Sequence, residues 1–221
     1  MIDVTVKLAT SLDGKIATRT GASQWITGVE ARKAVHEIRA AHDAIVTGVG
    51  TVLADNPHMN VRLDGEAGRQ PARLVLDSSL RTHPDAKIIK SSGGRSIILT
   101  ATDAGQDEAL SLRSAGAEVH SCSSGSDGSG IDIQNVIRFC EEQGFKSLMV
   151  EAGPRVVTSF LSSGVVKRIE WFRAPILIGG DGYAVVDGLN VSELAQSIRF
   201  RLGAVRKCGA DLWETYEIIK D

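Results

Sequence analysis

The chain has 221 residues, of which 43% are hydrophobic and 24% are charged, and its formal net charge is -2. These proportions are typical of a globular protein with one sizeable domain or two small ones. The near-neutral charge argues against a general nucleic-acid binder, and no apolar run reaches the length of a membrane span. The N-terminal MIDVTVKLATSLDGK alternates like a strand and lacks a signal-peptide core, so we expect a cytoplasmic protein.

Strands and helices are predicted to alternate along most of the chain. The apolar runs predict strands at 4–8, 44–47, 72–76, 96–100, 118–120, 147–150 and 168–173. Helical spacing of apolar residues predicts helices at 29–41, 107–115 and 133–142. This alternation indicates an α/β fold with a mostly parallel central sheet flanked by helices.

The C-terminal part of the chain has a different pattern. Residues 197–207 and 211–220 are strand-like runs joined by a short turn, which predicts an antiparallel hairpin at the edge of the sheet. The stretches 63–71 and 123–130 are loops by composition, and neither is long enough to divide the chain. We therefore expect a single domain covering residues 1–221.

The stretch KSLMVEAGPRVVTSFL is the first candidate site. A buried strand runs into Glu151, Gly153 and Pro154, and a helical pattern then continues to Gly164. Ligands of open α/β sheets bind at the carboxyl ends of strands, where a glycine allows backbone N–H groups to approach a phosphate. On local grounds it is equally plausible that Glu151 only caps a solvated turn and that Gly153 only supplies an unusual backbone angle.

The stretch TGVGTVLADNP is the second candidate site. It resembles a dinucleotide-binding glycine motif, but Leu53 occupies the third glycine position. Thr51 and Asp55 lie one helical turn apart and are expected to face the same ligand. The alternative is a plain strand-to-helix turn with Thr51 as the N-cap residue.

Other candidates are single residues beside predicted strands. Trp25, in SQWITG, is suited to stacking on a planar ring, although a core position is the commoner use of tryptophan. Ser78 and Arg81, in LDSSLR, are suited to binding a phosphate or to lying on a surface turn. Arg39 and Arg62 fit a phosphorylated substrate if they lie near the crevice, although each alone is more typical of a surface position.

Zinc, P-loop and serine-hydrolase chemistry are not supported by the sequence. The cysteines, at 122, 140 and 208, are far apart, and the histidines do not cluster at the spacing of metal ligands. The chain has neither a G-x-x-x-x-G-K-[ST] nor a G-x-S-x-G motif. We expect no metal site and inert cysteines.

Several of these segments occur together in a known order. KLATSLDGKIA, GASQWITG, TGVGTVLADNPHMNVR, LVLDSS and VEAGPRVVTSFLSSGVVKRIEWFRAPILIGG resemble the reductase domain of the bacterial riboflavin-biosynthesis deaminase–reductases over nearly the whole chain. The resemblance implies a dihydrofolate-reductase-like fold. It also implies NADPH-dependent reduction of 5-amino-6-(5-phosphoribosylamino)uracil at the ribose C1′.

The resemblance also implies roles for individual residues. The expected NADPH-binding residues are Ala9, Trp25, Thr51, Asp55, Ser78, Gly153, Pro154 and Arg155. The expected substrate-binding residues are Ser23, Arg39, Met59, Arg62 and Glu151, with the arginines meeting the 5′-phosphate. Asp55 and Glu151, together with Lys7, are the candidates for moving protons.

Three further expectations and their alternatives remain open. The family's deaminase domain is not part of this sequence, and the E-A-G-P form favours the deaminated, uracil-type substrate. The alternatives are the undeaminated diamino-pyrimidinone, another small heterocycle, or a nucleotide-binding protein without catalysis. The family also commonly forms homodimers, and the C-terminal hairpin offers a surface for one.

Overall fold

A computed structural model of the protein describes residues 2–63, 69–101, 105–124 and 130–219. These residues form two compact units. The first unit comprises residues 2–3 and the described part of 36–153, and the second comprises 4–35 and the described part of 154–221. The single reductase domain expected from the sequence stays a prediction.

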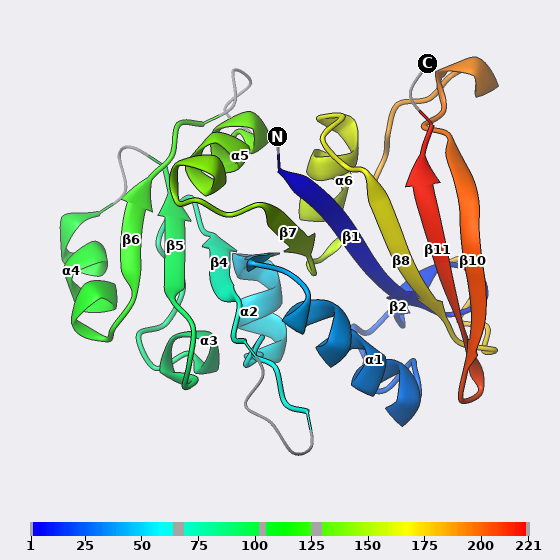
Figure 1. Ribbon diagram of the computed structural model, residues 1–221, viewed down its shortest axis with the longest axis horizontal. Helices are drawn as coiled ribbons and strands as arrows, with labels where there is room; N and C mark the ends of the chain where they lie inside the picture. Colours follow the sequence, from blue (N-terminus) through cyan, green and yellow to red (C-terminus); the bar gives the residue numbers. More distant parts are fainter. Residues whose placement is uncertain (1, 64–68, 102–104, 125–129, 220–221) are drawn as a thin grey trace. The chain divides into compact units, whose positions relative to one another are not determined.

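The first unit is built on five parallel strands (Figure 1). Their order is β7-β3-β4-β5-β6, and every adjacent pair is parallel. The strands are β3 (Ala44–Gly48), β4 (Ala72–Leu76), β5 (Ser96–Thr100), β6 (Glu118–Ser121) and β7 (Ser147–Val150). The predicted parallel α/β arrangement is therefore confirmed for this unit.

Burial on both faces explains why the central strands of this unit are mostly apolar. Every residue of β3 and β5 is buried, as expected for parallel strands covered on both sides. The helices of this unit are α2 (Val49–Asp55), α3 (Lys87–Lys90), α4 (Gln106–Ser114) and α5 (Ile133–Glu142). Helix α5 buries Ile133, Val136 and Cys140, which recur at helical spacing along one face.

Helix α1 (Val29–Ala40) contributes residues to both units, with 29–35 in the second and 36–40 in the first. Its buried apolar residues are Ala31, Ala34, Val35 and Ile38, which form one stripe along the helix. This stripe is the pattern that predicted a helix at 29–41.

The second unit has four strands in the order β10-β11-β8-β1. Strands β1 (Asp3–Thr10) and β8 (Arg168–Arg173) are parallel, whereas β11 (Asp211–Ile218) is antiparallel to both β8 and β10 (Phe200–Cys208). The C-terminal antiparallel hairpin is therefore confirmed (Figure 1). Helix α6 (Pro154–Ser162) begins at the proline predicted to start it.

Several short elements depart from the sequence-based assignment. The first hairpin strand starts at Phe200 rather than 197 because Ser197 ends a short 3₁₀ helix, η1 (Leu194–Gln196). Strands β2 (Lys15–Ala17) and β9 (Tyr183–Ala184) pair with each other, and neither they nor α3 were predicted. The loops predicted at 63–71 and 123–130, and the hairpin's predicted last residue, 220, lie partly or wholly outside the described residues.

No helix in the part of the chain that the structure describes has the length and apolarity needed to cross a bilayer.

Arg73 is a buried cation that holds the first unit together. It lies on β4 and is only 1% exposed. Its Nε donates to the Ile88 carbonyl at 2.9 Å, and its Nη2 donates to the Ser91 carbonyl at 3.1 Å and to Ser96 Oγ at 2.9 Å. Since these acceptors belong to α3, its C-cap and β5, one side chain ties β4 to the chain that follows α3.

We expect Arg73→Met to lower the free energy of unfolding by about 3 kcal/mol, because it leaves several buried carbonyls without a donor. Urea unfolding followed by circular dichroism measures the change. The control is Arg69→Met, since the Arg69 side chain is 71% exposed and its ion pair with Asp43 should contribute less than about 1 kcal/mol. Equal losses in the two variants would contradict the role given to Arg73.

Candidate active site

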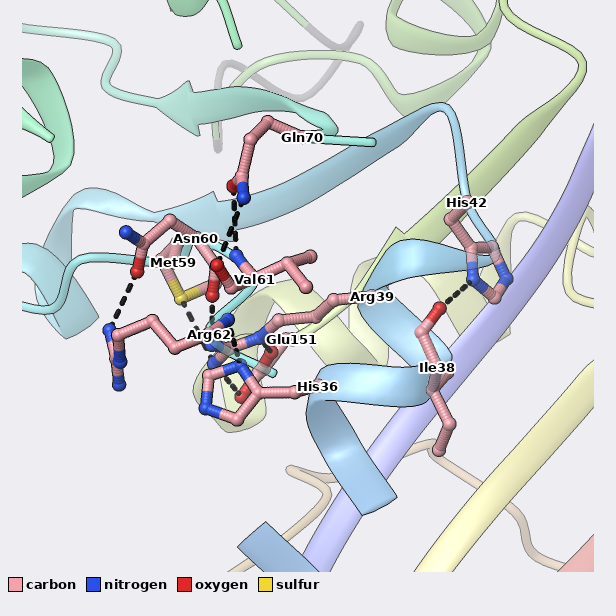
Figure 2. Close-up of polar contacts among 10 residues, drawn as sticks. All are labelled: His36, Ile38, Arg39, His42, Met59, Asn60, Val61, Arg62, Gln70 and Glu151. Atoms are coloured by element: carbon pink, nitrogen blue, oxygen red, sulfur yellow. Dashed lines mark hydrogen bonds and ion pairs between the residues drawn. The ribbon is translucent and has the colours of Figure 1, made fainter. Parts of the chain in front are cut away.

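Glu151 extends from the carboxyl end of β7 and is fixed by Arg39 of α1 (Figure 2). Arg39 Nε donates to Glu151 Oε2 at 2.9 Å, and Arg39 Nη2 donates to Oε1 at 2.9 Å. The side chains of Arg39 and Glu151 are only 10% and 17% exposed, respectively. A planar guanidinium that binds both carboxylate oxygens fixes the direction in which the carboxylate points.

The remaining donors of Arg39 also contact protein groups. Its Nη1 donates to the Asn60 carbonyl at 3.0 Å, and its Nη2 lies 4.0 Å from Met59 Sδ. Met59 is buried and has a left-handed backbone, with φ of 52°, which turns the chain toward Arg39. In this arrangement Arg39 positions Glu151 and the segment containing Asn60, and its expected contact with a phosphate stays a prediction.

Arg62 is the exposed cation beside this pair (Figure 2). Its Nη1 donates to Asn60 Oδ1 at 2.6 Å, and its backbone N–H donates to His36 Nδ1 at 3.2 Å. Among the residues that the structure describes, no carboxylate forms an ion pair with Arg62. Partial burial, with the nearby Arg39 charge, lowers the pKa of Arg62 from its ordinary value. An anion bound here would relieve this repulsion.

Thr51 and Gly153 meet at the ends of β3 and β7. Thr51 lies inside α2 because the N-cap residue is Gly48, so the alternative that Thr51 caps the helix is wrong. Instead, its Oγ1 accepts a hydrogen bond from the Gly153 N–H at 3.2 Å. A Cβ added to Gly153 would lie 3.7 Å from Thr51 Oγ1, an ordinary contact, so the protein itself does not require glycine there.

Asp55 ends α2, one turn after Thr51, and is exposed. Neighbouring protein partly removes water from its carboxyl group, which raises the pKa of Asp55 above its ordinary value. A solvent-facing carboxyl group with a raised pKa keeps its proton to a higher pH than an ordinary aspartate, which suits a group that exchanges protons with a ligand.

The turn after β4 carries Ser78 and Arg81 and is anchored by Asp77. Asp77 is fully buried, and its Oδ2 accepts hydrogen bonds from Thr82 N and Thr82 Oγ1, both at 2.7 Å. This contact closes the turn between residues 77 and 82. Ser78 is half-buried and Arg81 is exposed, so both side chains remain accessible for a phosphate contact.

The other expected site residues belong to the second unit. Trp25 is 70% exposed, so the alternative of a core position is wrong. Arg32 Cζ lies 4.5 Å from the centroid of the Trp25 ring, a cation–π contact on one face of the indole. The remaining residues are half-buried Ala9 on β1, half-buried Ser23, Pro154 at the start of α6, and exposed Arg155.

The structure therefore brings together two groups of expected site residues: Arg39, Met59, Arg62 and Glu151 in one, Thr51 and Gly153 in the other. Convergence of all the expected residues on one groove stays a prediction. Sequence reasoning missed His36, Asn60 and Gln70, which support the first group. Only His36 had a usable signal, since it lies three residues before Arg39 on the same helix.

Two of the three cysteines are buried in the first unit. Cys122 and Cys140 are buried, and burial raises the pKa of the Cys140 thiol to about 12. A thiol in this state is a poor nucleophile. Within 2–63, 69–101, 105–124 and 130–219, no three metal-binding side chains gather at one point.

The comparisons with known proteins find relatives that agree with one another. The model of the RibD C-terminal domain family matches residues 3–213. The riboflavin biosynthesis protein RibD of Aquifex aeolicus is 35% identical over 209 residues, which cover 95% of this chain and 56% of that protein. The 2,5-diamino-6-ribosylamino-4(3H)-pyrimidinone 5′-phosphate reductase of Methanothermobacter thermautotrophicus is 35% identical, and the match covers 97% of both chains.

Among solved structures, RibD of Acinetobacter baumannii superposes with a TM-score of 0.84 at 27% identity. The match covers all of this chain and 59% of that one. The chain thus spans a little more than half the length of the RibD proteins that it matches.

We expect Arg39→Leu to lower the free energy of unfolding by about 3 kcal/mol, because it leaves the Glu151 carboxylate buried without its partner. The double variant Arg39→Leu with Glu151→Leu should recover at least about 1 kcal/mol of that loss, since no unpaired charge remains. Urea unfolding of both variants and of Arg62→Leu, as the exposed-arginine control, gives the comparison. A double variant less stable than Arg39→Leu would contradict this account of the pair.

Proposed function

The chain belongs to the RibD C-terminal domain family, and we propose that it is a reductase of riboflavin biosynthesis. The proposed reaction is NADPH-dependent reduction of 5-amino-6-(5-phosphoribosylamino)uracil to its ribitylamino product, with hydride addition to C1′. A relative of nearly the same length is named as a reductase of a closely related ribosylaminopyrimidine phosphate, which supports the reaction class.

The observation that carries the proposal is the fixed carboxylate of Glu151 near the exposed cation of Arg62. The two suit opposite ends of one substrate. Glu151 would accept hydrogen bonds from N–H groups of the pyrimidine or hydroxyls of the ribityl chain. Arg62 would bind the 5′-phosphate, since its charge has no carboxylate partner among the described residues and its guanidinium geometry suits phosphate oxygens.

A second candidate substrate is the undeaminated diamino-pyrimidinone. It is supported by the name of the Methanothermobacter relative, which matches over 97% of both chains. The two pyrimidines differ at one ring substituent, an amino group or an oxygen. Discrimination would therefore depend on which donors and acceptors face that substituent.

Two observations on the first unit support NADPH as the cofactor. Gly153 has room for a Cβ, so its backbone is open to a close approach by a pyrophosphate where α6 begins. Ser78 and Arg81 lie on the turn anchored by Asp77 and would meet the 2′-phosphate that distinguishes NADPH from NADH. Thr51 would fix Gly153 through its hydroxyl. The expected cofactor contact of Trp25, which belongs to the second unit, stays a prediction.

The reduction needs proton movements on both sides of the hydride transfer. The C1′–O4′ bond breaks as O4′ gains a proton, and the amino nitrogen loses one, which gives an imine. A bound NADPH would supply the hydride for C1′, and a proton would then return to the nitrogen. Among the candidates, Asp55 is favoured as the group that moves protons because its pKa is raised, whereas both Glu151 oxygens already accept hydrogen bonds from Arg39.

Homodimer formation and a cytoplasmic location stay predictions. The hairpin supports the former, since β10 lies at the edge of its sheet and exposes Leu202 and Val205. An unpaired strand edge with apolar side chains is suited to pairing with a second chain.

The test of the proposed function is NADPH oxidation measured with each of the two ribosylaminopyrimidine phosphates. We expect turnover with the uracil compound to exceed turnover with the diamino compound. A clear preference for the diamino compound would select the second candidate. Cofactor binding without turnover of either would overturn the proposal in favour of a non-catalytic nucleotide-binding protein.

We expect Glu151→Gln to raise the KM for the pyrimidine by about tenfold, because the substrate loses one charged hydrogen-bond acceptor. The Kd for NADPH should change less than about twofold. Steady-state kinetics and fluorescence titration with NADPH measure the two constants. Equal weakening of both ligands would count against a substrate contact for Glu151.

We expect Ser78→Ala combined with Arg81→Ala to lower the preference for NADPH over NADH by about tenfold or more, because two phosphate contacts are lost. Titration with both cofactors measures the ratio. Arg138→Ala, which removes an exposed arginine of α5, is the matched control and should leave the ratio unchanged. An unchanged NADPH/NADH ratio in the double variant would contradict binding of the 2′-phosphate at this turn.

A further inference from the structure

We propose that His36 is a positioning residue of the phosphate-binding site, where its neutral ring fixes the backbone of Arg62 by accepting the Arg62 N–H. The inference rests on the proposed function, since Arg62 is the residue proposed to bind the phosphate monoester. It adds a residue to the site, and it makes binding of the anionic substrate depend on the ionisation of a histidine.

Several hydrogen bonds fix the segment that carries Arg62 (Figure 2). Gln70 Oε1 accepts from Val61 N, and Gln70 Nε2 donates to the Val61 carbonyl, both at 2.9 Å. Asn60 Oδ1 accepts from Arg62 Nη1 at 2.6 Å. The next backbone donor, Arg62 N–H, reaches His36 Nδ1 at 3.2 Å. Of these partners, only His36 is titratable, so it alone can break its contact by gaining a proton.

Accepting this hydrogen bond requires Nδ1 to be unprotonated. A neutral imidazole then carries its proton on Nε2. Protonation would place an Nδ1–H against the Arg62 N–H, so that two donors face each other. The charged form of His36 is therefore incompatible with the contact that fixes Arg62.

The surroundings of His36 keep it in the required form. Partial burial is the largest influence and lowers the pKa of His36, and the positive charges of Arg39 and Arg62 lower it further. A hydrogen bond to the Asn60 backbone and the negative charge of Glu151 act in the opposite direction, but each is weaker than these influences. Arg39 lies on the same helix, whereas Arg62 and Glu151 approach from other segments (Figure 2). The lowered pKa and the contact with the Arg62 N–H both favour the neutral ring.

A second histidine, His58, also lies near Arg62, and its pH effect must be distinguished from that of His36. His58 Nδ1 lies 2.7 Å from Ser91 Oγ, and the charge of Arg62 contributes to lowering the pKa of His58 as well. His58 has no hydrogen bond to Arg62 among the contacts of the described residues. A pH effect that passes through the Arg62 N–H therefore belongs to His36, and His58→Asn distinguishes the two.

The direct test begins with the wild-type protein. In a pH titration followed by NMR, the Arg62 amide resonance should move with the same midpoint as the His36 imidazole, and that midpoint should lie below about 6.5. The movement should persist in His58→Asn and disappear in His36→Asn, because the asparagine oxygen takes the place of Nδ1 but does not titrate. An Arg62 amide that ignores the ionisation of His36 overturns the proposal.

The functional test uses ribose 5-phosphate as the probe, measured by calorimetry at neutral pH. His36→Leu should weaken binding about fivefold, the loss of one neutral hydrogen bond, whereas His36→Asn should stay within about twofold of the wild type. His42→Asn is the matched control, because His42 bonds the Ile38 carbonyl on the same helix, away from Arg62. Urea unfolding shows whether each variant is folded.

In turnover of the phosphorylated pyrimidine, the wild-type KM should rise as pH falls from about 7.5 to about 5.5, with kcat little affected. In His36→Asn the KM should rise less, since only the phosphate group itself still titrates. A His36→Asn profile identical to the wild type overturns the proposal, as does an His36→Leu variant that binds ribose 5-phosphate normally.

Arg62→Ala separates this inference from the proposed function. Loss of ribose 5-phosphate binding in Arg62→Ala, but not in His36→Leu, would overturn the role of His36 and leave the phosphate site intact. If the wild type does not bind ribose 5-phosphate, or Arg62→Ala binds it normally, the phosphate placement fails and the role of His36 fails with it.

Discussion

The ion pair between Arg39 and Glu151 is the constraint on which the candidate site depends. It joins the last turn of α1 to the residue that follows β7 and gives each carboxylate oxygen one hydrogen bond. A buried ion pair gains little net stability, because the desolvation of both charges offsets their attraction. What the pair gives the site is direction, since a carboxylate held at two points keeps one orientation when a ligand arrives.

This pair also determines how the two arginines differ. Arg39 is buried and occupied by Glu151 and the Asn60 carbonyl. Arg62 is exposed, and its hydrogen bonds to other described residues come from one guanidinium nitrogen and its backbone N–H. One cation therefore acts within the protein, and the other is available to an anion. The neighbouring strands β7, β3 and β4 end a few residues before Gly153, Thr51 and Ser78, respectively. Ligands of parallel sheets bind at such strand ends, so the fold itself accounts for the location of these residues.

Much of this arrangement could be predicted from the sequence. The buried strands are continuous apolar runs and α1 carries a regular apolar stripe, so both were placed within a few residues. The short elements α3, β2 and β9 were missed because a few residues carry too little periodicity. The partner of Arg39 could not be read from the sequence, because Glu151 lies 112 residues away and only the folded sheet brings the two together. The His36 contact with the Arg62 backbone could not be predicted either. A backbone N–H does not depend on which residue type stands at position 62.

The central claim is that the fixed carboxylate and the exposed arginine bind opposite ends of one phosphorylated substrate beside the cofactor. A crystal structure with NADP⁺ and the ribitylamino product bound together is its most direct test. The account predicts that the pyrimidine or ribityl chain contacts Glu151, that the phosphate contacts Arg62, and that the nicotinamide faces the product C1′. A product bound away from Glu151, or a phosphate bound away from Arg62, would contradict it.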